Sequence, residues 1–537
     1  MKHYTFLFLS LFITYYASAQ FSYDGYPTTS ALLASKSPKQ QQNIINAQNR
    51  ILNYVNQHGL NHQKTVITIP VVVHVLYHDI SQNISDALVQ SQIDVLNKDY
   101  NRLNSDTSLT RSIFKPVAAN CQIQFKLATQ DEAGFPTTGI IHSYTDTAMW
   151  DNPLDPYHIT QQMKDSSIGG QVAWNPNAYL NIWVCNIHPT LLGFSSIPGD
   201  PMNEDGVVIS YHYFGSGGGS VAPYDKGRTT THEVGHWLGL YHPFEGSCVG
   251  LNSATCANTG DFCCDTPPVA TADFGCNQTL NTCSEIPNMP DMVENYMMYT
   301  DDACMNMFTL DQAARMSSTI NAYRTPILTS AGAATISLLS NDIGVYYIVN
   351  AIANAQNCPF PSRVRVHNFG SNTVTNFTIN VQIDNDPIHQ YTWTGNLPTA
   401  FNADVTLGNI APVNTTTTHH FKAWTSLPNN VTDANSSNDS KASNFLCVAN
   451  GINTTDANAT LFSVFPNPGT DIITLYYSGE SVNTTYTIQN AVGQLVVNPT
   501  TIRNSNNTIS ISTLSPGVYF LTVQAEKTKQ TIKLIKN

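Results

Sequence analysis

The sequence has few charged residues. Only 11% of its 537 residues are charged, and 24 basic against 37 acidic residues give a net charge of −13; an average soluble protein has about 25% charged residues. A nucleic-acid-binding protein needs a basic face, and a protein held on an anionic membrane surface needs a polybasic segment. We therefore expect neither nucleic acid nor a membrane surface as a partner. Hydrophobic residues make up 42% of the chain, so a packed core is expected.

The sequence also lacks a long apolar run outside its N-terminus. There, Lys2 precedes an apolar run at residues 4–16, and small residues follow at 17–19. The run is shorter than the roughly 20 residues that a membrane-spanning helix needs. The pattern is typical of a secretory signal peptide covering residues 1–19. We therefore expect an exported protein with no transmembrane segment.

Cysteine is absent from residues 20–64, although the chain has 11 cysteines. Seven of them lie between Cys248 and Cys304, which fits disulfides formed in an oxidising compartment. A second, structural zinc site is the alternative for this cluster. Cys358 and Cys447 bracket a later β-rich segment and are expected to pair across it. The odd total leaves at least one cysteine unpaired within the chain.

Hydrophobic periodicity predicts an N-terminal α/β domain. Residues 66–75 form an apolar run that is typical of a buried strand. Apolar side chains then recur at helical spacing over residues 89–103, and Leu103 is the last of them. This spacing predicts a long amphipathic helix. Further strands are expected at 123–128, 180–187 and 206–211. This strand–helix–strand order is typical of an α/β unit.

Three more helices are expected. In a separate segment formed by residues 20–65, four apolar residues fall on one helical face: Ile44, Ile51, Leu52 and Val55. A second helix is expected at about 226–240. The third begins at Thr309, because Thr309 and Gln312 form a capping-box pattern that is typical of a helix N-terminus.

Two β-rich segments follow. Alternating apolar and polar residues, as at 374–383, predict an all-β sandwich over residues 335–450. A linker at 451–460 leads to a second β-rich block at 461–537. The expected fold class is therefore α/β (α+β), with a twisted sheet and a functional helix over residues 66–328, followed by two all-β sandwich domains.

One motif, HEVGHWLGLYH, carries recognisable chemistry. His232 and His236 are four residues apart, so on a helix they lie on one face and can share a metal ion. Gly239 can end the helix in a left-handed conformation, which lets His242 reach the same ion. Three imidazoles and an open position are typical of catalytic zinc. Glu233, beside the first ligand, is placed to act as general base on a zinc-bound water.

This motif resembles the elongated zinc motif of the metzincin metalloproteases. The sequence NYMMY at 295–299 resembles their Met-turn. Three further stretches resemble the pappalysin branch of that group: LNIWV at 180–184, DTP at 265–267 and CMNMFT at 304–309. The resemblance covers about residues 66–325. It implies a secreted zinc endopeptidase that hydrolyses protein or peptide substrates.

The resemblance also implies roles for individual residues. It makes His232, His236 and His242 the zinc ligands, Glu233 the base, Met297 the Met-turn methionine, and Tyr299 the phenol that steadies the tetrahedral intermediate. It pairs Cys276 with Cys304, and Cys283 with one of Cys248, Cys256, Cys263 or Cys264. Relatives bind calcium in this loop, so calcium is a second expected cofactor and Asp265 a candidate ligand.

The two C-terminal segments carry resemblances of their own. YTWTG at 391–395 and DAN at 433–435 resemble a cell-adhesion-type immunoglobulin-like domain, expected to be a spacer or, alternatively, a binding module. FPNP at 465–468, NAVGQ at 490–494 and LSPGVYF at 514–520 resemble the type IX secretion sorting domain. This implies that the type IX machinery is a partner and that the protein reaches the surface or surroundings of a Gram-negative bacterium.

Two further predictions concern latency and specificity. Asp24 is the only acidic residue in the pro-segment at residues 20–65. This stretch resembles the aspartate-bearing pro-peptides of other bacterial metzincins, so we expect a zymogen with Asp24 in the fourth zinc position. Asp302 lies five positions after Met297, where pappalysin relatives that prefer basic residues carry an Asp. This implies a preference for Arg or Lys just after the scissile bond.

A different class of function is also open. The same sequence could belong to a surface adhesin or binding protein whose metzincin domain is inactive. The zinc ligands, the base, the Met-turn methionine and the tyrosine are all present, which favours the enzyme.

Overall fold

The structure is a computed structural model. It describes residues 36–58, 65–150, 161–217, 220–249, 256–284, 287–349, 355–357, 360–410, 418–448, 462–465, 467, 469, 472–477, 484–502, 506–524 and 529–536. The expected signal peptide, Asp24 and the linker at 451–460 lie outside these residues, as do the side chains of Cys358 and Cys447. No described helix is long and apolar enough to cross a membrane.

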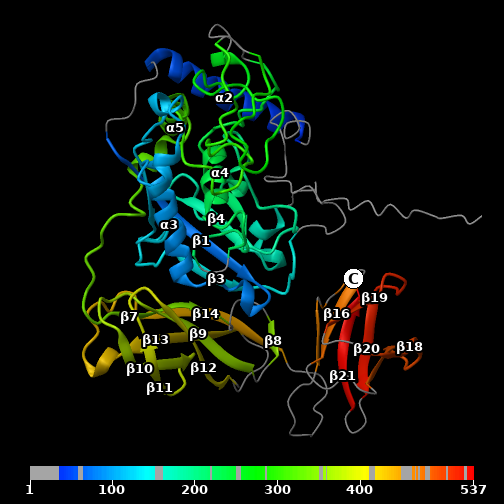
Figure 1. Cartoon of the computed structure of the whole chain (residues 1–537). Coiled ribbons are helices and arrows are strands. Elements are labelled where there is room, and N and C mark those ends of the chain that lie inside the picture. The colour runs from blue at the N-terminus through cyan, green and yellow to red at the C-terminus, as the bar shows by residue number, and fades with distance from the viewer. Residues whose placement is uncertain are drawn as a thin grey trace, which may run out of the picture.

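The first domain contains one mixed sheet in the order β2-β1-β4-β6-β5, with β3 also paired to β1 (Figure 1). Its strands are β1 (Ile67–Tyr77), β2 (Ile123–Leu127), β3 (Ile140–Tyr144), β4 (Leu180–Cys185), β5 (Gly193–Ser195) and β6 (Val207–Ser210). β1 runs parallel to β2, β3 and β4, and β6 runs parallel to β4. β5 is antiparallel to β6 and forms one end of the sheet.

In the part of the chain that the structure describes, four α-helices accompany this sheet: α2 (Pro38–His58), α3 (Asp86–Tyr100), α4 (Arg228–Trp237) and α5 (Leu310–Ala322). α5 starts at the capping box that the sequence predicts, with Thr309 and Gln312 bonded reciprocally. α3 ends at Tyr100. The expectation that Leu103 continues the helix is wrong, because Arg102 adopts a φ of 53° and Leu103 is 72% exposed.

Short 3-10 helices connect these elements. In this domain they lie at Ile80–Gln82, Ser105–Leu109, Lys115–Val117, Gln162–Lys164, Ser166–Ile168, Met202–Glu204, Cys256–Asn258 and Thr325–Thr329, and a further one, Pro428–Asn430, lies in the second domain. The main core joins the buried face of β1 to the helices: Val71 and Val73 from β1 pack in one cluster with Val89 and Leu96 from α3 and Val234 from α4.

The second domain is a sandwich of two sheets, in the orders β11-β10-β13-β14-β8 and β12-β9-β7. Its strands are β7 (Ile343–Ile348), β8 (Ala355–Asn357), β9 (Phe360–Asn368), β10 (Val374–Ile383), β11 (His389–Leu397), β12 (Asn402–Ile410), β13 (Thr418–Ser426) and β14 (Ser440–Val448). All pairings are antiparallel except that of β14 with β8. The two sheets share an apolar core that includes Val364, Phe377 and Phe421.

The third domain has two smaller antiparallel sheets, in the orders β15-β16-β19 and β18-β17-β20-β21. Its strands are β15 (Phe462–Phe465), β16 (Ile472–Tyr477), β17 (Thr485–Asn490), β18 (Leu495–Thr501), β19 (Asn506–Ser510), β20 (Gly517–Gln524) and β21 (Lys529–Lys536). Ile473, Ile488 and Leu521 lie in their shared core. The expected fold class, an α/β domain followed by two all-β sandwiches, is confirmed.

Candidate active site

Helix α4 is buried at all 10 of its positions. Its N-cap is Gly227, whose left-handed φ of 76° is open to glycine at little cost. The first N–H groups of a helix have no partner within the helix. Here the Asp302 Oδ2 accepts hydrogen bonds from the backbone N–H groups of Lys226 (2.8 Å) and Arg228 (3.2 Å). The segment after the Met-turn therefore holds the start of α4.

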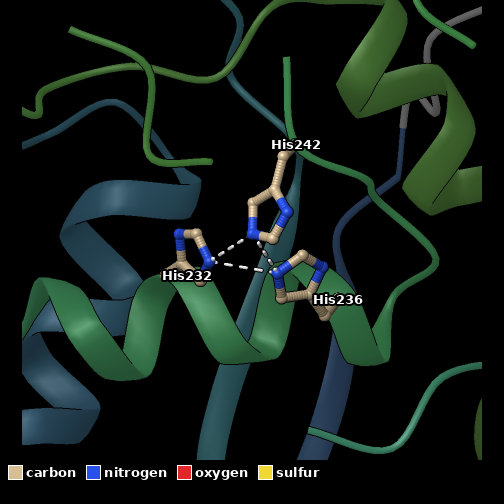
Figure 2. A group of neighbouring side chains, drawn as sticks. All are labelled: His232, His236 and His242. Atoms are coloured by element: carbon tan, nitrogen blue, oxygen red, sulfur yellow. Dashed lines mark hydrogen bonds between the residues drawn. The ribbon is translucent and has the colours of Figure 1, made fainter. Parts of the chain in front are cut away.

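Three histidines converge above α4 (Figure 2). The Nε2 atoms of His232 and His236 are 3.0 Å apart, and the His242 Nε2 lies 3.2 Å and 3.0 Å from them. All three residues are buried. Gly239 has the left-handed φ, 85°, that the sequence predicts for the turn between His236 and His242. These histidines form the one cluster of potential metal ligands among the described residues.

The imidazole hydrogen bonds favour metal binding. The His232 Nδ1 lies 2.7 Å from the Tyr296 carbonyl oxygen, and the His236 Nδ1 lies 2.9 Å from the Leu240 carbonyl oxygen. A carbonyl oxygen only accepts, so each Nδ1 carries the proton and each Nε2 offers a lone pair. Converging neutral imidazole nitrogens in a buried position fit the donor set of catalytic zinc.

The Met-turn lies against the middle of α4. Met297 is fully buried, and a Cβ added to Gly235 would lie 2.5 Å from its Sδ. Asn295 fixes the turn in two ways. Its Oδ1 accepts from the Met297 N–H (2.9 Å), and its side-chain amide forms a double hydrogen bond with that of Gln312 in α5 (2.9 and 3.0 Å). Only a glycine at 235 lets the methionine approach the helix this closely.

Glu233 and Tyr299 lie beside the histidines. Glu233 is fully buried, and a Cβ added to Gly193 would lie 3.2 Å from its Cγ, so β5 passes next to its side chain. The Tyr299 ring centre is 5.0 Å from that of His242 and 5.8 Å from that of His232. The structure therefore brings together all the residues for which the sequence predicts a direct part in catalysis.

A buried polar network that the sequence analysis missed supports this site. The Arg228 guanidinium binds the Asp99 carboxylate and donates to the Tyr296 hydroxyl (2.5 Å) and to Asp106 (3.1 Å). The other Asp99 oxygen accepts from the Thr231 hydroxyl (2.7 Å). Since the Tyr296 carbonyl oxygen contacts the His232 imidazole, the network joins α3, α4 and the Met-turn. No local sequence pattern marks these residues, because Arg228 and Asp99 are 129 positions apart in the chain.

Asp302, the predicted specificity residue, is fully buried. Its Oδ2 binds the start of α4, whereas its Oδ1 has no hydrogen-bond partner among the described residues. Burial raises the pKa of Asp302 to about 7, against the opposing effect of the N–H groups of Lys226 and Arg228. One carboxylate oxygen is thus available to a further donor.

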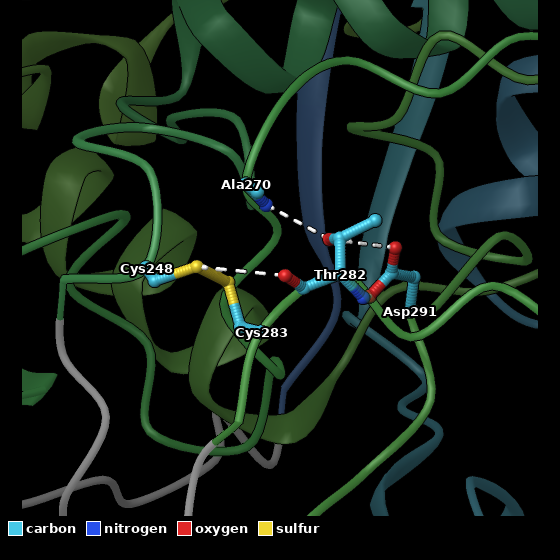
Figure 3. Close-up of a disulfide and its surroundings, with 5 residues drawn as sticks. All are labelled: Cys248, Ala270, Thr282, Cys283 and Asp291. Atoms are coloured by element: carbon cyan, nitrogen blue, oxygen red, sulfur yellow. Dashed lines mark hydrogen bonds between the residues drawn. A yellow bond between two sulfur atoms is a disulfide. The ribbon is translucent and has the colours of Figure 1, made fainter.

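The long loop after the zinc motif is closed by disulfides. Cys276 pairs with Cys304, as the family resemblance implies, Cys283 pairs with Cys248, and Cys256 pairs with Cys264. Beside the second of these bonds, the Thr282 hydroxyl and N–H both donate to Asp291 and the hydroxyl accepts from the Ala270 N–H (Figure 3). Cys263 is buried and outside the three disulfides.

Asp265, the calcium candidate, contacts helix α5. Its Oδ2 accepts from the Asp311 N–H (3.0 Å), and burial raises its pKa to about 6. Among the described residues it belongs to no cluster of three potential metal ligands. The observed contact is that of a residue that holds the start of a helix.

Comparison with known proteins agrees with this geometry. Residues 162–321 match the family described as pregnancy-associated plasma protein-A, a peptidase family, and residues 463–537 match the secretion system C-terminal sorting domain. An extracellular metalloprotease of Verticillium alfalfae is 30% identical over 262 residues, which are 46% of this chain and 77% of that protein. Extracellular metalloprotease 1 of Coccidioides posadasii is 46% identical over 107 residues, 20% of this chain and 35% of that protein.

Among solved structures, a promirolysin mutant of Tannerella forsythia has a TM-score of 0.50 and 38% identity, and the match covers 57% of this chain and 97% of that one. A twisted sheet beside a helix that bears three converging imidazoles, with a methionine turn against that helix, defines a metzincin-type metalloprotease. The chain belongs to the pregnancy-associated plasma protein-A peptidase family. The family makes it a metalloendopeptidase, and the C-terminal sorting domain makes it a secreted or cell-surface protein.

Proposed function

We propose that this protein is made as a zymogen and, once activated, hydrolyses peptide bonds with one zinc ion held by His232, His236 and His242. The observation that carries the proposal is the convergence of three buried Nε2 lone pairs within 3.2 Å of one another. Zinc bound there would act as a Lewis acid and would lower the pKa of a bound water.

Glu233 is the proposed general base. It follows His232 directly on α4, so its carboxylate and the metal ligands share one rigid, buried helix. We assign to it the transfer of a proton from the attacking water to the amine leaving group. General acid–base groups of this kind contribute typically about 10²–10⁴-fold to the rate.

Tyr299 and β5 are proposed to bind the substrate. The Tyr299 ring packs against His242, so its hydroxyl can donate a hydrogen bond to the oxygen anion that develops on the substrate carbonyl. β5 lies at the end of the sheet and next to Glu233. An extended peptide that pairs with the outer edge of β5 would place its backbone beside the base.

Asp302 is proposed to set the preference for Arg, and less strongly Lys, just after the scissile bond. Its buried Oδ1 can accept a charge-assisted hydrogen bond from a substrate guanidinium. The bonds from the start of α4 hold the other oxygen and so fix the orientation of the carboxylate. The same geometry also serves α4 itself, so the residue has two roles.

For latency and domain organisation the proposals rest on the sequence. Residues 20–65 form the pro-segment, and Asp24 fills the fourth zinc position before activation. Residues 66–328 form the catalytic domain, 335–450 an immunoglobulin-like spacer, and 461–537 the domain read by the type IX machinery. An Asp24→Ala zymogen is expected to lose latency.

A casein-cleavage assay tests the proposed function. The Glu233→Ala variant is expected to lose at least about 10²-fold in kcat/KM. The matched control is Glu132→Ala, an exposed glutamate after β2, which should keep the parent activity. Equal activity in Glu233→Ala and the parent would refute the catalytic role, and an inactive parent that holds zinc would favour a binding protein.

A further inference from the structure

Helix α2 lies on the catalytic domain at a surface formed by α5, Tyr241 and the turn at Gly199. Ile44, Ala47 and Ile51 are the buried residues of its contact face. The approach at Gly199 is between backbones, since a Cβ there would lie 2.5 Å from the Ile44 Cα. Figure 1 shows α2 beside α5 at one end of the domain. We call the part of the catalytic domain that α2 contacts, formed by α5, Tyr241 and the turn at Gly199, the α2 surface.

Polar contacts fix the helix along its length. Before its first turn, Lys36 forms an ion pair with Asp200 (3.0 Å). Near its middle, the Arg50 guanidinium donates to the Ala322 carbonyl oxygen at the end of α5 (2.6 Å). Contacts at both of these points define one register for α2 on the surface.

One contact connects α2 to the turn that carries the third zinc ligand. The Gln48 Oε1 accepts from the Arg315 Nη2 (2.6 Å) and from the Tyr241 hydroxyl (3.3 Å). Arg315 in turn donates from Nε to the Gly239 carbonyl oxygen (2.6 Å). Tyr241 directly precedes His242. The two hydrogen bonds of Gln48 therefore brace the turn between the helix and this ligand from outside.

We propose that α2 is a docking module of the pro-segment, an amphipathic helix that binds the α2 surface without needing a covalent link to the catalytic domain and that braces the turn before His242. The proposal rests on the proposed function in one respect, the assignment of residues 20–65 as a pro-segment. Ile44 approaches the backbone at Gly199, whereas the side chain of Glu233 lies next to Gly193 in β5, where we propose that the substrate pairs. The partner that this surface fits is an amphipathic helix whose apolar residues are spaced as Ile44, Ala47 and Ile51 are in α2.

The test uses the full chain in a Glu233→Ala background, which prevents self-cleavage. Recognition sites for a specific protease are inserted within residues 25–35 and within residues 59–64, so that cutting frees α2 from both sides. After cutting, the α2 fragment is expected to elute with the rest of the chain in size-exclusion chromatography at micromolar concentration. Separation of the fragment from the parent chain would overturn the proposal.

A matched pair of variants separates specific docking from chance association. Ile44 is 2% exposed, whereas its neighbour Ile45 is 44% exposed. Ile44→Asp should release the fragment after cutting, and Ile45→Asp should retain it. Equal behaviour of the two variants would contradict the assigned contact face. Circular dichroism before cutting establishes that both variants fold.

Hydrogen exchange tests the brace. Amides at 239–242 are expected to exchange faster once α2 has been released, and also in the uncut Gln48→Ala variant. If the exchange of amides 239–242 were unchanged in both cases, Gln48 would not brace this turn. None of these measurements uses activity, so a failure of the catalytic proposal in the casein assay would be distinguishable from a failure of α2 docking.

Discussion

Helix α4 is buried at all 10 of its positions, whereas helix α2 buries three of its 21. The charged residue that begins α4, Arg228, is paired with Asp99 and Asp106, and the helix crosses the domain beside the sheet. α2 buries only the face that contacts the domain, and more than half of its residues are exposed. In the proposed function both helices nevertheless bear on the same zinc site, α4 by carrying two of the proposed ligands and α2 by bracing the turn before His242.

The comparison separates two ways of positioning a ligand. A ligand on α4 moves only if the domain core moves, because the helix shares its packing with β1, α3 and the Met-turn. A ligand on the turn at 239–242 depends in part on side-chain contacts that α2 can make or lose. Variants in the α4 network should therefore destabilise the whole catalytic domain, and variants in α2 should act locally.

The largest effect is expected from Asp99→Ala. It leaves the buried Arg228 without its main counter-charge, and breaking a buried pair in this way costs about 3–5 kcal/mol. The measurement is chemical denaturation of the catalytic domain within the full chain, in the Glu233→Ala background. Asp94→Ala, an exposed residue of the same helix, is the control, with an expected change within about 0.5 kcal/mol. Similar losses in the two variants would contradict the network.

Ile51→Ala should cost about 2–4 kcal/mol, because it removes most of a side chain that is 1% exposed. We expect the loss to appear as faster amide exchange in α2 and at 239–242, with β1 unaffected. Ile45→Ala is the control. Faster exchange throughout β1 would show that α2 belongs to the cooperative core and would erase the contrast with α4.

Specificity gives a smaller effect with a defined pH dependence. The pKa of Asp302, raised to about 7 by burial, means that its carboxyl is neutral below that pH and charged above it. The ratio of kcat/KM for an Arg substrate to that for a Leu substrate should therefore rise with pH through about 7. Asp302→Asn should lower this ratio about ten- to a hundredfold above pH 7, the loss of one charge-assisted contact of about 1.5–3 kcal/mol.

The use of a ratio cancels pH effects shared by both substrates.

The same carboxyl binds its proton more tightly in the folded than in the unfolded state, so its contribution to stability should fall as pH rises from about 4 to about 7. In the Asp302→Asn variant this pH-dependent contribution to the free energy of unfolding should be absent. A parent that cuts before Leu as readily as before Arg at every pH would contradict the assignment.

The smallest effect is expected from Lys36→Ala. Its ion pair with Asp200 lies just before the first turn of α2, where the lysine side chain is 15% exposed and the aspartate side chain 3%. In the variant the Ile197 N–H still donates to the Asp200 Oδ2 (3.0 Å) and water can take the place of the lysine, so we expect a loss of about 1 kcal/mol that weakens with salt. We expect slightly faster exchange in the first turn of α2 at low salt and none of this difference at high salt. A loss as large as that of Ile51→Ala would mean that charge, and not apolar contact, holds the helix.

Sequence periodicity predicts the local parts of this structure well. The spacing of His232 and His236 and the glycine before His242 specify the triad because each constraint acts within 11 residues. The capping box at Thr309 is equally local. By contrast, β5 has three residues and no alternation to recognise. Leu103 continues an apolar period that a left-handed Arg102 interrupts.

Sequence periodicity does not predict contacts between distant parts of the chain. Arg228 and Asp99 are 129 residues apart in sequence, and Gln48 and Arg315 are 267 apart. Ala47 is buried against the domain although an alanine carries little signal of its own. Such pairs follow from how elements pack, and one sequence without the fold does not specify them.

A zinc titration of the metal-free protein tests the central claim most directly. The account predicts that the Glu233→Ala protein binds one zinc ion tightly, that His232→Ala, His236→Ala and His242→Ala in that background each weaken binding strongly, and that His212→Ala, an exposed histidine, leaves it unchanged. If His242→Ala bound zinc as tightly as the protein with all three histidines, the three-imidazole site would be contradicted.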